Sequence, residues 1–201
     1  PVHATVFYDQ LKKLADYILE HNLDMEKDYY ISLFEEKYFR PKQEDDLENW
    51  CGGNGVMLAV DPDGIIYPCL RYMESSLAGQ QEPYSIGDVD TGICQCECHK
   101  CRVECLKKID RRTQSTDECF NCPVAEGCSW CTAYNYQVFG TPDARATYIC
   151  NMHKARALGN IYFWNNYYKK HGIDKHMENY VPEKWALDII TQAEWNMLNS
   201  L

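Results

Sequence analysis

Four of the chain's cysteines lie within thirteen residues, in the stretch CFNCPVAEGCSWC at 119–131. Thiols this dense serve disulfide bonds, a zinc site or an iron–sulfur cluster. Twelve cysteines would suit a secreted disulfide scaffold, but such scaffolds are short and poor in core. This chain has 201 residues, 45% of them hydrophobic, and its N-terminal sequence shows no export signal. The composition therefore favours metal ligands over disulfides.

The dense stretch alone fits either zinc or a cubane cluster, because its cysteines form two Cys-x2-Cys pairs. The remaining cysteines distinguish these possibilities. Cys51 is followed by twelve residues, Gly64, four more residues and Cys69, and an isolated Cys150 follows the dense stretch. A single zinc ion takes four ligands and would leave these three thiols without a role.

The full spacing resembles the seven-cysteine SPASM domain, the C-terminal extension of many radical SAM enzymes that modify peptides and proteins. That family's motif runs C-x(9–15)-G-x4-C, C-x2-C-x5-C-x3-C and a last C. Here Cys128 and Cys131 are separated by two residues instead of three. The words GCSWCTAYNYQ and TYICNMHKA resemble a subgroup of peptide maturases in which the shorter spacing occurs. The resemblance covers roughly residues 50–165.

The resemblance implies two auxiliary [4Fe–4S] clusters, with the chain crossing between them. The first cluster would be held by Cys51, Cys69 and Cys131. Its fourth iron would be open to substrate or take a thiolate from elsewhere. The second cluster would be held by Cys119, Cys122, Cys128 and Cys150. No catalytic residue is assigned.

The chain has the spacing C-x3-C-x2-C once, at Cys94, Cys98 and Cys101, overlapping Cys98-x2-Cys101-x3-Cys105, in which the spacings are reversed. We do not assign this crowded run as the cluster motif that radical SAM chemistry needs. By resemblance, a catalytic barrel that uses S-adenosylmethionine precedes the domain in the complete enzyme, and the chain alone is expected not to generate a radical. Its partners would be a peptide substrate and that catalytic domain or subunit. Five further cysteines lie outside the seven-cysteine pattern: Cys94, Cys96, Cys98, Cys101 and Cys105. Three roles are open for them: one could supply the fourth ligand of the first cluster, several could bind zinc, or all could be unligated surface thiols.

Two alternatives remain open. A non-catalytic zinc module that binds a protein partner would use the four cysteines of 119–131. A free-standing electron carrier would use the same two clusters to serve another protein.

The elements that must position these thiols belong to the α+β class: a small lobe centred on a β-hairpin and flanked by helices. Apolar periodicity predicts a helix over 4–22, a second over 29–39 and a longer one from Cys150 to roughly Lys170. VMLAV-DPDG-IIYPC predicts a hairpin between Cys51 and Cys69, with Gly64 accepting a positive φ.

Further short elements are expected around and after the dense stretch. YSIGDVD predicts a strand and turn, and the second half of ICQCECHKCRVECLKKIDRR a helix. A helix over 128–139 would end at Gly140, and the tail would be helical, with Thr191 and Glu194 as a cap. The preferred interpretation of the basic residues after Cys105 is a solvated helix face: Lys107, Lys108, Arg111 and Arg112. The expected segments are 1–50, a helical lead-in; 51–150, the cluster domain; and 151–201, C-terminal helices.

The formal charge of −10 argues against a nucleic-acid partner, because a phosphate backbone would be repelled. No apolar run approaches the roughly 20 residues that span a bilayer, so a membrane partner is not expected. A cytoplasmic protein is the resulting prediction. Pro1 leads directly into an amphipathic pattern, which suggests a piece of a longer protein.

Overall fold

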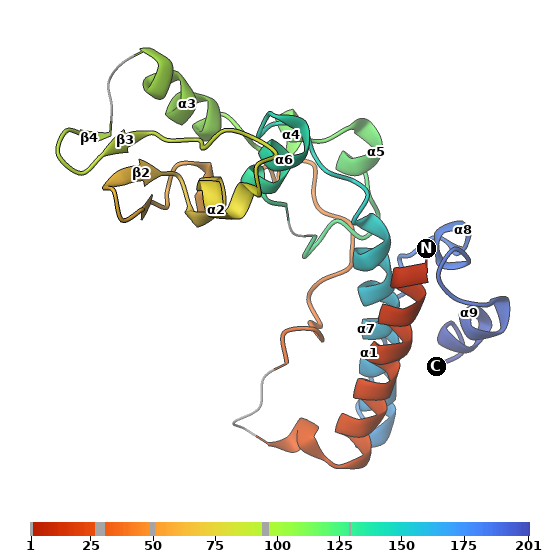
Figure 1. Cartoon of the computed structure of the whole chain (residues 1–201). Helices are drawn as coiled ribbons and strands as arrows, with labels where there is room; N and C mark the ends of the chain where they lie inside the picture. Colours follow the sequence, from red (N-terminus) through yellow and green to blue (C-terminus); the bar gives the residue numbers. More distant parts are fainter. Residues whose placement is uncertain (1, 27–30, 49–50, 94–96, 129) are drawn as a thin grey trace. The chain divides into compact units, whose positions relative to one another are not determined.

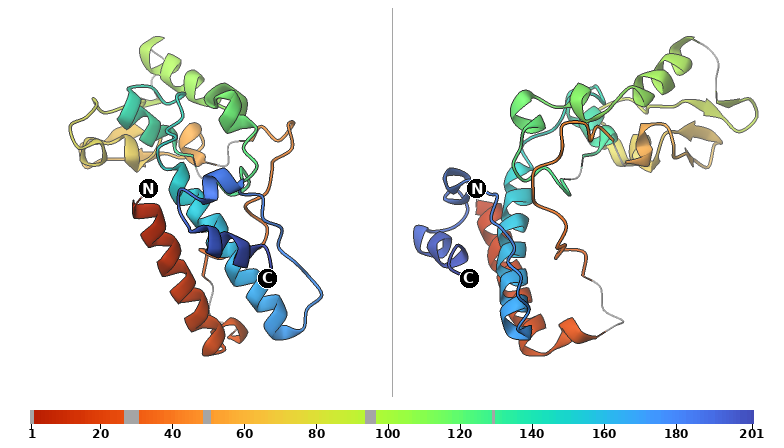
Figure 2. Two further views of the ribbon diagram at one scale, coloured as in Figure 1. Left: turned by 90° about the vertical axis from the view of Figure 1, so that its right-hand side faces the viewer. Right: turned by 180° about the vertical axis from the view of Figure 1, so that it is seen from behind.

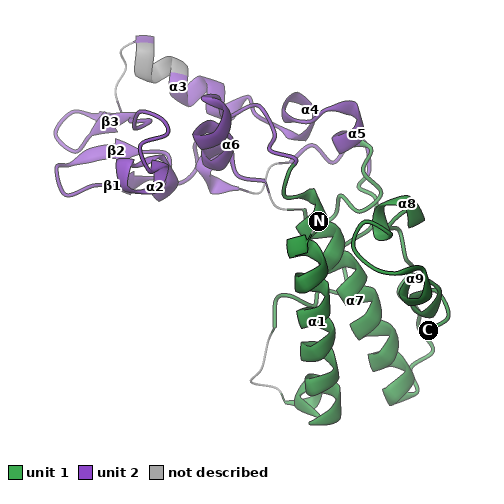
Figure 3. Cartoon of the chain, turned by 45° about the vertical axis from the view of Figure 1, so that its right-hand side comes forward, with its two compact units in different colours: residues 1–42, 121–128, 148–201 green, residues 43–120, 129–147 purple. Residues whose placement is uncertain are grey.

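A computed structural model describes residues 2–26, 31–48, 51–93, 97–128 and 130–201 (Figure 1). The chain divides into two compact units (Figure 3). The helical unit comprises residues 1–42, 121–128 and 148–201, and the cysteine unit comprises 43–120 and 129–147. Helices and a small antiparallel sheet are both present, so the predicted α+β class is confirmed at that level.

The helical unit is built on α1 (Val2–Glu20) and α7 (Cys150–His171), which lie side by side in both views of Figure 2. They pack tightly at Gly159, where a Cβ would lie 2.9 Å from Cδ1 of Leu11. Any side chain at that position would push the helices apart, which explains a glycine in a helix interior. The remaining elements of this unit are η1 (Leu23–Met25), α8 (Glu183–Ala186) and α9 (Gln192–Leu198).

Sequence periodicity located both long helices correctly. In α1 the buried residues are Ala4, Tyr8, Leu11, Ala15 and Ile18, so the apolar stripe starts one turn earlier than expected. In α7 burial extends beyond one stripe, because other segments of the unit cover several of its sides. Thr191 caps α9 as predicted, with its Oγ1 accepting a hydrogen bond from Glu194 N at 3.2 Å.

The predicted helix over 29–39 is wrong for its described part, residues 31–39, which form turns and extended backbone. Side chains of α7 take its backbone groups: Asn160 Oδ1 accepts from Glu35 N at 2.7 Å, and Asn160 Nδ2 donates to Leu33 O at 2.8 Å. Arg156 Nε donates to Leu33 O as well, at 3.0 Å. Two turns of helical pattern are therefore overridden by tertiary hydrogen bonds. Residues 29 and 30 lie outside the described residues.

The cysteine unit contains a four-stranded antiparallel meander in the order β1-β2-β3-β4 (Figure 1). Its strands are β1 (Ala59–Val60), β2 (Ile65–Tyr67), β3 (Gly87–Asp88) and β4 (Gly92–Ile93). The predicted hairpin is confirmed: Ala59 pairs with Tyr67, and Gly64 has a φ of 81° in the turn. The strand and turn in YSIGDVD are confirmed by β3 and the turn that follows it.

Short helical turns surround this sheet. They are η2 (Gly52–Asn54), η3 (Leu70–Tyr72), α2 (Glu74–Leu77), α3 (Glu97–Lys107), α4 (Arg111–Gln114), α5 (Asp117–Phe120) and α6 (Thr132–Phe139). The helix expected over 128–139 starts later, at Thr132, and ends at Gly140 as predicted. Within the described residues, none of the helices is long and apolar enough to cross a membrane.

Candidate metal centre

Three cysteines occupy the same local position in the cysteine unit. Cys51 precedes η2, Cys69 precedes η3 and Cys131 precedes α6, each as the extended residue before a helical turn. At this position the first backbone N–H groups of a turn point toward the capping side chain. For Cys131 this is explicit, because Tyr134 N donates to its Sγ at 3.4 Å.

Two of these thiols and the first residue of α6 lie beside Gly53. A Cβ placed on Gly53 would lie 3.4 Å from Cys69 Sγ and 3.6 Å from Cys51 Sγ. The same point is 3.6 Å from Oγ1 of Thr132, the first residue of α6, whose hydroxyl donates to Gly53 O at 3.3 Å. The absence of a side chain at Gly53 therefore leaves room beside two sulfurs, in a cradle that a larger residue would fill.

The electrostatics of the thiols identify the same three neighbours. Burial raises the pKa of Cys69, which is 7% exposed, and the nearby thiolates of Cys131 and Cys51 raise it further, while backbone N–H groups of Arg71 and Tyr72 act in the opposite direction. Burial also raises the pKa of Cys131, opposed by the positive charge of Arg71. Three sulfurs, turn N–H groups and one cation thus share a partly buried site.

This donor set fits the sulfur-rich face of an iron–sulfur cluster. Soft thiolates select iron–sulfur clusters, zinc or Cu(I) over hard cations. Within the described residues, no group of three or more His, Cys, Asp or Glu side chains is arranged as a ligand set for a metal ion. The fit therefore rests on the type of donor atom, on the proximity of Cys69 to Cys51 and Cys131, and on the cradle at Gly53; the first ligand set stays a prediction.

Members of the expected second ligand set are divided between the two units. Cys122, Cys128 and Cys150 belong to the helical unit, and Cys119 belongs to the cysteine unit, in α5. Cys150 is the first residue of α7. One turn later, Nε2 of His153 forms a hydrogen bond with Val124 O at 2.7 Å, which holds the loop of Cys122 and Cys128 against this first turn.

The same loop is anchored from its other side. Phe39 N donates to Glu126 O at 3.0 Å, and Glu126 N donates to Arg40 O at 2.9 Å. Cys122 packs against the main core of the helical unit. The loop is thus positioned by backbone bonds and core contacts of the helical unit.

Three of the four basic residues after Cys105 lie exposed as expected, namely Lys107, Lys108 and Arg112, whereas Arg111 does not. Arg111 is only 5% exposed and donates to Gln43 O at 2.7 Å, to Asp46 O at 3.0 Å and to Phe120 O. The solvated-face interpretation is wrong for this residue, because three carbonyl groups replace its hydration. The cation that acts on the three-thiol site is instead Arg71, two residues after Cys69.

The extra cysteine group is described only at its end. Cys94 and Cys96 lie outside the described residues, and so do the side chains of Cys98 and Cys101. Cys105 lies exposed on α3. The role of the extra cysteine group stays a prediction with the three alternatives given above.

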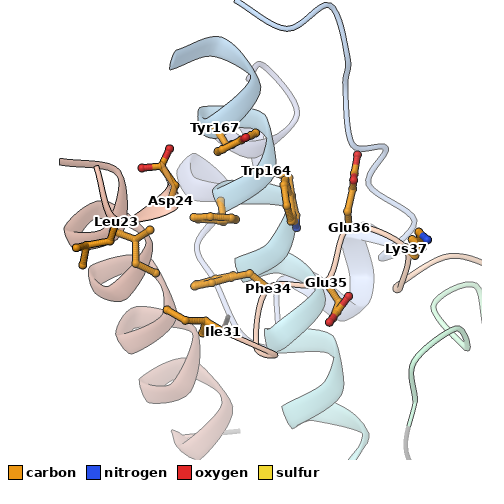
Figure 4. Close-up of a pocket in the computed structure, with 11 residues that line it drawn as sticks. Leu23, Asp24, Ile31, Phe34, Glu35, Glu36, Lys37, Trp164 and Tyr167 are labelled. Atoms are coloured by element: carbon orange, nitrogen blue, oxygen red, sulfur yellow. The ribbon is translucent and has the colours of Figure 1, made fainter. Parts of the chain in front are cut away.

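A pocket of about 390 Å³ lies in the helical unit, between η1, the segment 31–37 and α7 (Figure 4). Aromatic rings line it, including Phe34 and Trp164. Two of its carboxylates already serve structural ion pairs: Asp24 with Lys170 at 3.0 Å, and Glu36 with Lys175 at 3.0 Å. Because these carboxylates are engaged in ion pairs within the unit, the pocket is a weaker candidate for a functional site than the three-thiol site.

Comparison with protein-family models, curated proteins and solved structures finds no match to this chain.

Sequence reasoning missed two residues that organise the molecule. Tyr72 lies fully buried against the three-thiol site, and its only sequence signal is a position three residues after Cys69. Asn160 was hidden in the apolar pattern of α7, where a buried amide holds the segment before it.

Proposed function

We propose that this chain is the auxiliary cluster domain of a radical SAM enzyme that modifies a ribosomally made peptide. Two [4Fe–4S] clusters would be held by the first and second ligand sets, and S-adenosylmethionine would be used only in the complete enzyme. In that enzyme the chain would position the peptide and relay an electron after hydrogen abstraction. When bound, an iron–sulfur cluster supplies reversible one-electron transfer.

The observation that carries the proposal is the proximity of Cys69 to both Cys51 and Cys131, with Cys51 and Cys69 beside Gly53. These residues are up to eighty positions apart in the sequence and share no local motif. The seven-cysteine spacing groups the same three as one ligand set. Sulfur neighbours from three separate turns support a bound group with several thiolate ligands.

The zinc-module alternative fits less well. It requires Cys131 as a ligand together with Cys119, Cys122 and Cys128. Cys131 instead has Cys69 as an electrostatic neighbour within the cysteine unit. It also gives no role to the cradle beside Cys51 and Cys69.

Iron, sulfide and zinc per chain, measured after anaerobic purification together with a visible spectrum, test the proposal. About eight irons with matching sulfide and a brown colour are expected for two cubane clusters. Stoichiometric zinc without iron would overturn the proposal and favour the structural module.

The division of ligands is tested by Cys150→Ala. This change should remove one cluster, about four irons, and leave the other, because Cys150 belongs to the second set alone. The helical circular dichroism signal of the variant, compared with that of wild type, checks that the helical unit still folds. Loss of neither cluster, or of both in a folded variant, would contradict the division.

A further inference from the structure

A buried tyrosine accompanies the three thiols. Tyr72 is 0% exposed and ends η3, the turn that Cys69 begins. Its ring packs against those of Tyr84 and Tyr136, with centroid distances of 5.0 and 5.8 Å. The ring therefore has ample apolar contact, and its hydroxyl is the part that needs an explanation.

The neighbouring tyrosines direct their hydroxyl groups to backbone carbonyls. Tyr136 donates to Glu82 O at 2.8 Å, and Tyr84 lies 3.5 Å from Arg102 O. The Tyr72 oxygen is buried, and no hydrogen bond of normal geometry reaches it from the described residues. A buried hydroxyl without a partner destabilises the fold, so its retention requires a reason.

The surroundings of this hydroxyl indicate its partner. Thr132 lies beside it, but the Thr132 hydroxyl is engaged with Gly53 O at 3.3 Å. Thr132 Oγ1 also lies 3.6 Å from the cradle point at Gly53, and Cys69 Sγ lies 3.4 Å from that point. Thr132 is therefore a neighbour of both the Tyr72 hydroxyl and the cradle beside Cys51 and Cys69.

Tyr72 is present there as a proton donor. A phenol carries its proton at neutral pH. A donor beside sulfur ligands favours the more negative form of whatever they hold.

We propose that the Tyr72 hydroxyl donates a hydrogen bond to the iron–sulfur cluster held by Cys51, Cys69 and Cys131, and so raises its reduction potential. The inference rests on the proposed function. Tyr72 is then a positioning residue that changes the electron affinity of the cluster. In the titration, dithionite supplies one electron, the cluster is reduced by that electron, and the phenol keeps its proton. Hydrogen bonds to cluster sulfurs are among the levers that set such potentials.

Tyr72→Phe tests the inference, because it removes the hydroxyl and keeps the ring. Tyr84→Phe is the matched control, since it removes a hydroxyl from the same ring cluster that faces a backbone carbonyl. The cluster-loaded chain is titrated with dithionite and followed by electron paramagnetic resonance. The signal lost in Cys69→Ser identifies the cluster of interest. Tyr72→Phe should shift its potential to a more negative value, and Tyr84→Phe should leave it unchanged.

A second measurement does not depend on the stability of a variant. In the reduced wild-type protein, an exchangeable proton should couple magnetically to this cluster and disappear in D2O. Absence of that coupling overturns the inference, and so does an unchanged potential in a folded Tyr72→Phe variant. Equal shifts in both tyrosine variants would assign the effect to packing and overturn it too. In all these cases the proposed function stands, whereas failure of the wild-type chain to bind iron and sulfide would overturn both.

Discussion

The helical unit and the cysteine unit differ in what holds them together. In the helical unit, α1 and α7 contribute long apolar surfaces, and the core draws on the C-terminal segments as well. In the cysteine unit, no described strand exceeds three residues and most helical segments have three or four. Its core includes Cys69 itself. Small scaffolds with little regular structure usually need a metal or a cross-link, so we expect the cysteine unit to depend on its bound group and the helical unit to depend on packing.

The largest effect is expected for Cys69→Ser. Loss of this buried ligand should remove about four irons and make the cysteine unit sensitive to protease, because the three-thiol site ties η2, η3 and α6 together. Iron and sulfide analysis with limited proteolysis and mass mapping measures both. The helical unit should remain resistant, which would separate the two modes of stabilisation.

Leu70→Ser is the control for that change. Leu70 is the next residue and is exposed, so its replacement should leave iron content and protease resistance unchanged. Full iron content in Cys69→Ser, or the same loss of iron in both variants, would contradict the expectation that the cysteine unit depends on a group bound by Cys69.

A medium effect is expected for Asn160→Ala in the helical unit. The fully buried amide accepts from Glu35 N and donates to Leu33 O. Its loss leaves Glu35 N without this partner, while Leu33 O keeps its hydrogen bond from Arg156. The free energy of unfolding should fall by about 1–3 kcal/mol, measured by urea unfolding followed through the helical circular dichroism signal.

Asn166→Ala on the same helix provides the matched control. Its amide donates only to Tyr162 O within α7, at 2.8 Å, so a much smaller loss is expected. An equal loss in both variants would show that segment 31–39 contributes nothing to the stability of the unit.

The smallest effect is a pH dependence at Asp24, whose side chain is 2% exposed. Burial, the largest single influence, raises its pKa, but hydrogen bonds from His171 and Lys170 together outweigh it and hold the pKa below the ordinary value. The ionised form is therefore favoured by folding. Its contribution is complete above about pH 4 and is lost as the pH falls further.

Thermal unfolding at several pH values checks this expectation. Wild type should lose more stability than Asp24→Asn between about pH 5 and pH 2. Asp9→Asn, a charge change at an exposed position of α1, should follow the wild-type profile. Parallel profiles for wild type and Asp24→Asn would show that the Asp24 ion pair does not contribute to the stability of the helical unit.

Local signals predicted much of the fold. Apolar periodicity located α1 and α7, the Asp-Pro-Asp-Gly turn located the hairpin, and Gly140 located the end of α6. Each of these features depends on residues within a few positions of one another. Segment 31–39 has the same kind of helical pattern, yet its backbone is held by Asn160, over 120 residues away.

The candidate site shows the same limit. Resemblance grouped Cys51, Cys69 and Cys131, and in the structure Cys69 has both of the others as neighbours. The buried Tyr72 hydroxyl and the influence of Arg71 had no spacing signal of their own, because they depend on how η3 and α6 pack.

The sequence by itself determined the long helices, the hairpin and the type of ligand atom available, because helix and turn propensity and thiol chemistry are properties of single residues and short windows. Only the tertiary structure decided which thiols are neighbours, which polar groups are buried among them and where a helical pattern is abandoned. Those outcomes depend on contacts between residues far apart in the chain, since a buried hydrogen bond or a helix crossing outweighs local preference wherever the fold brings its partners together.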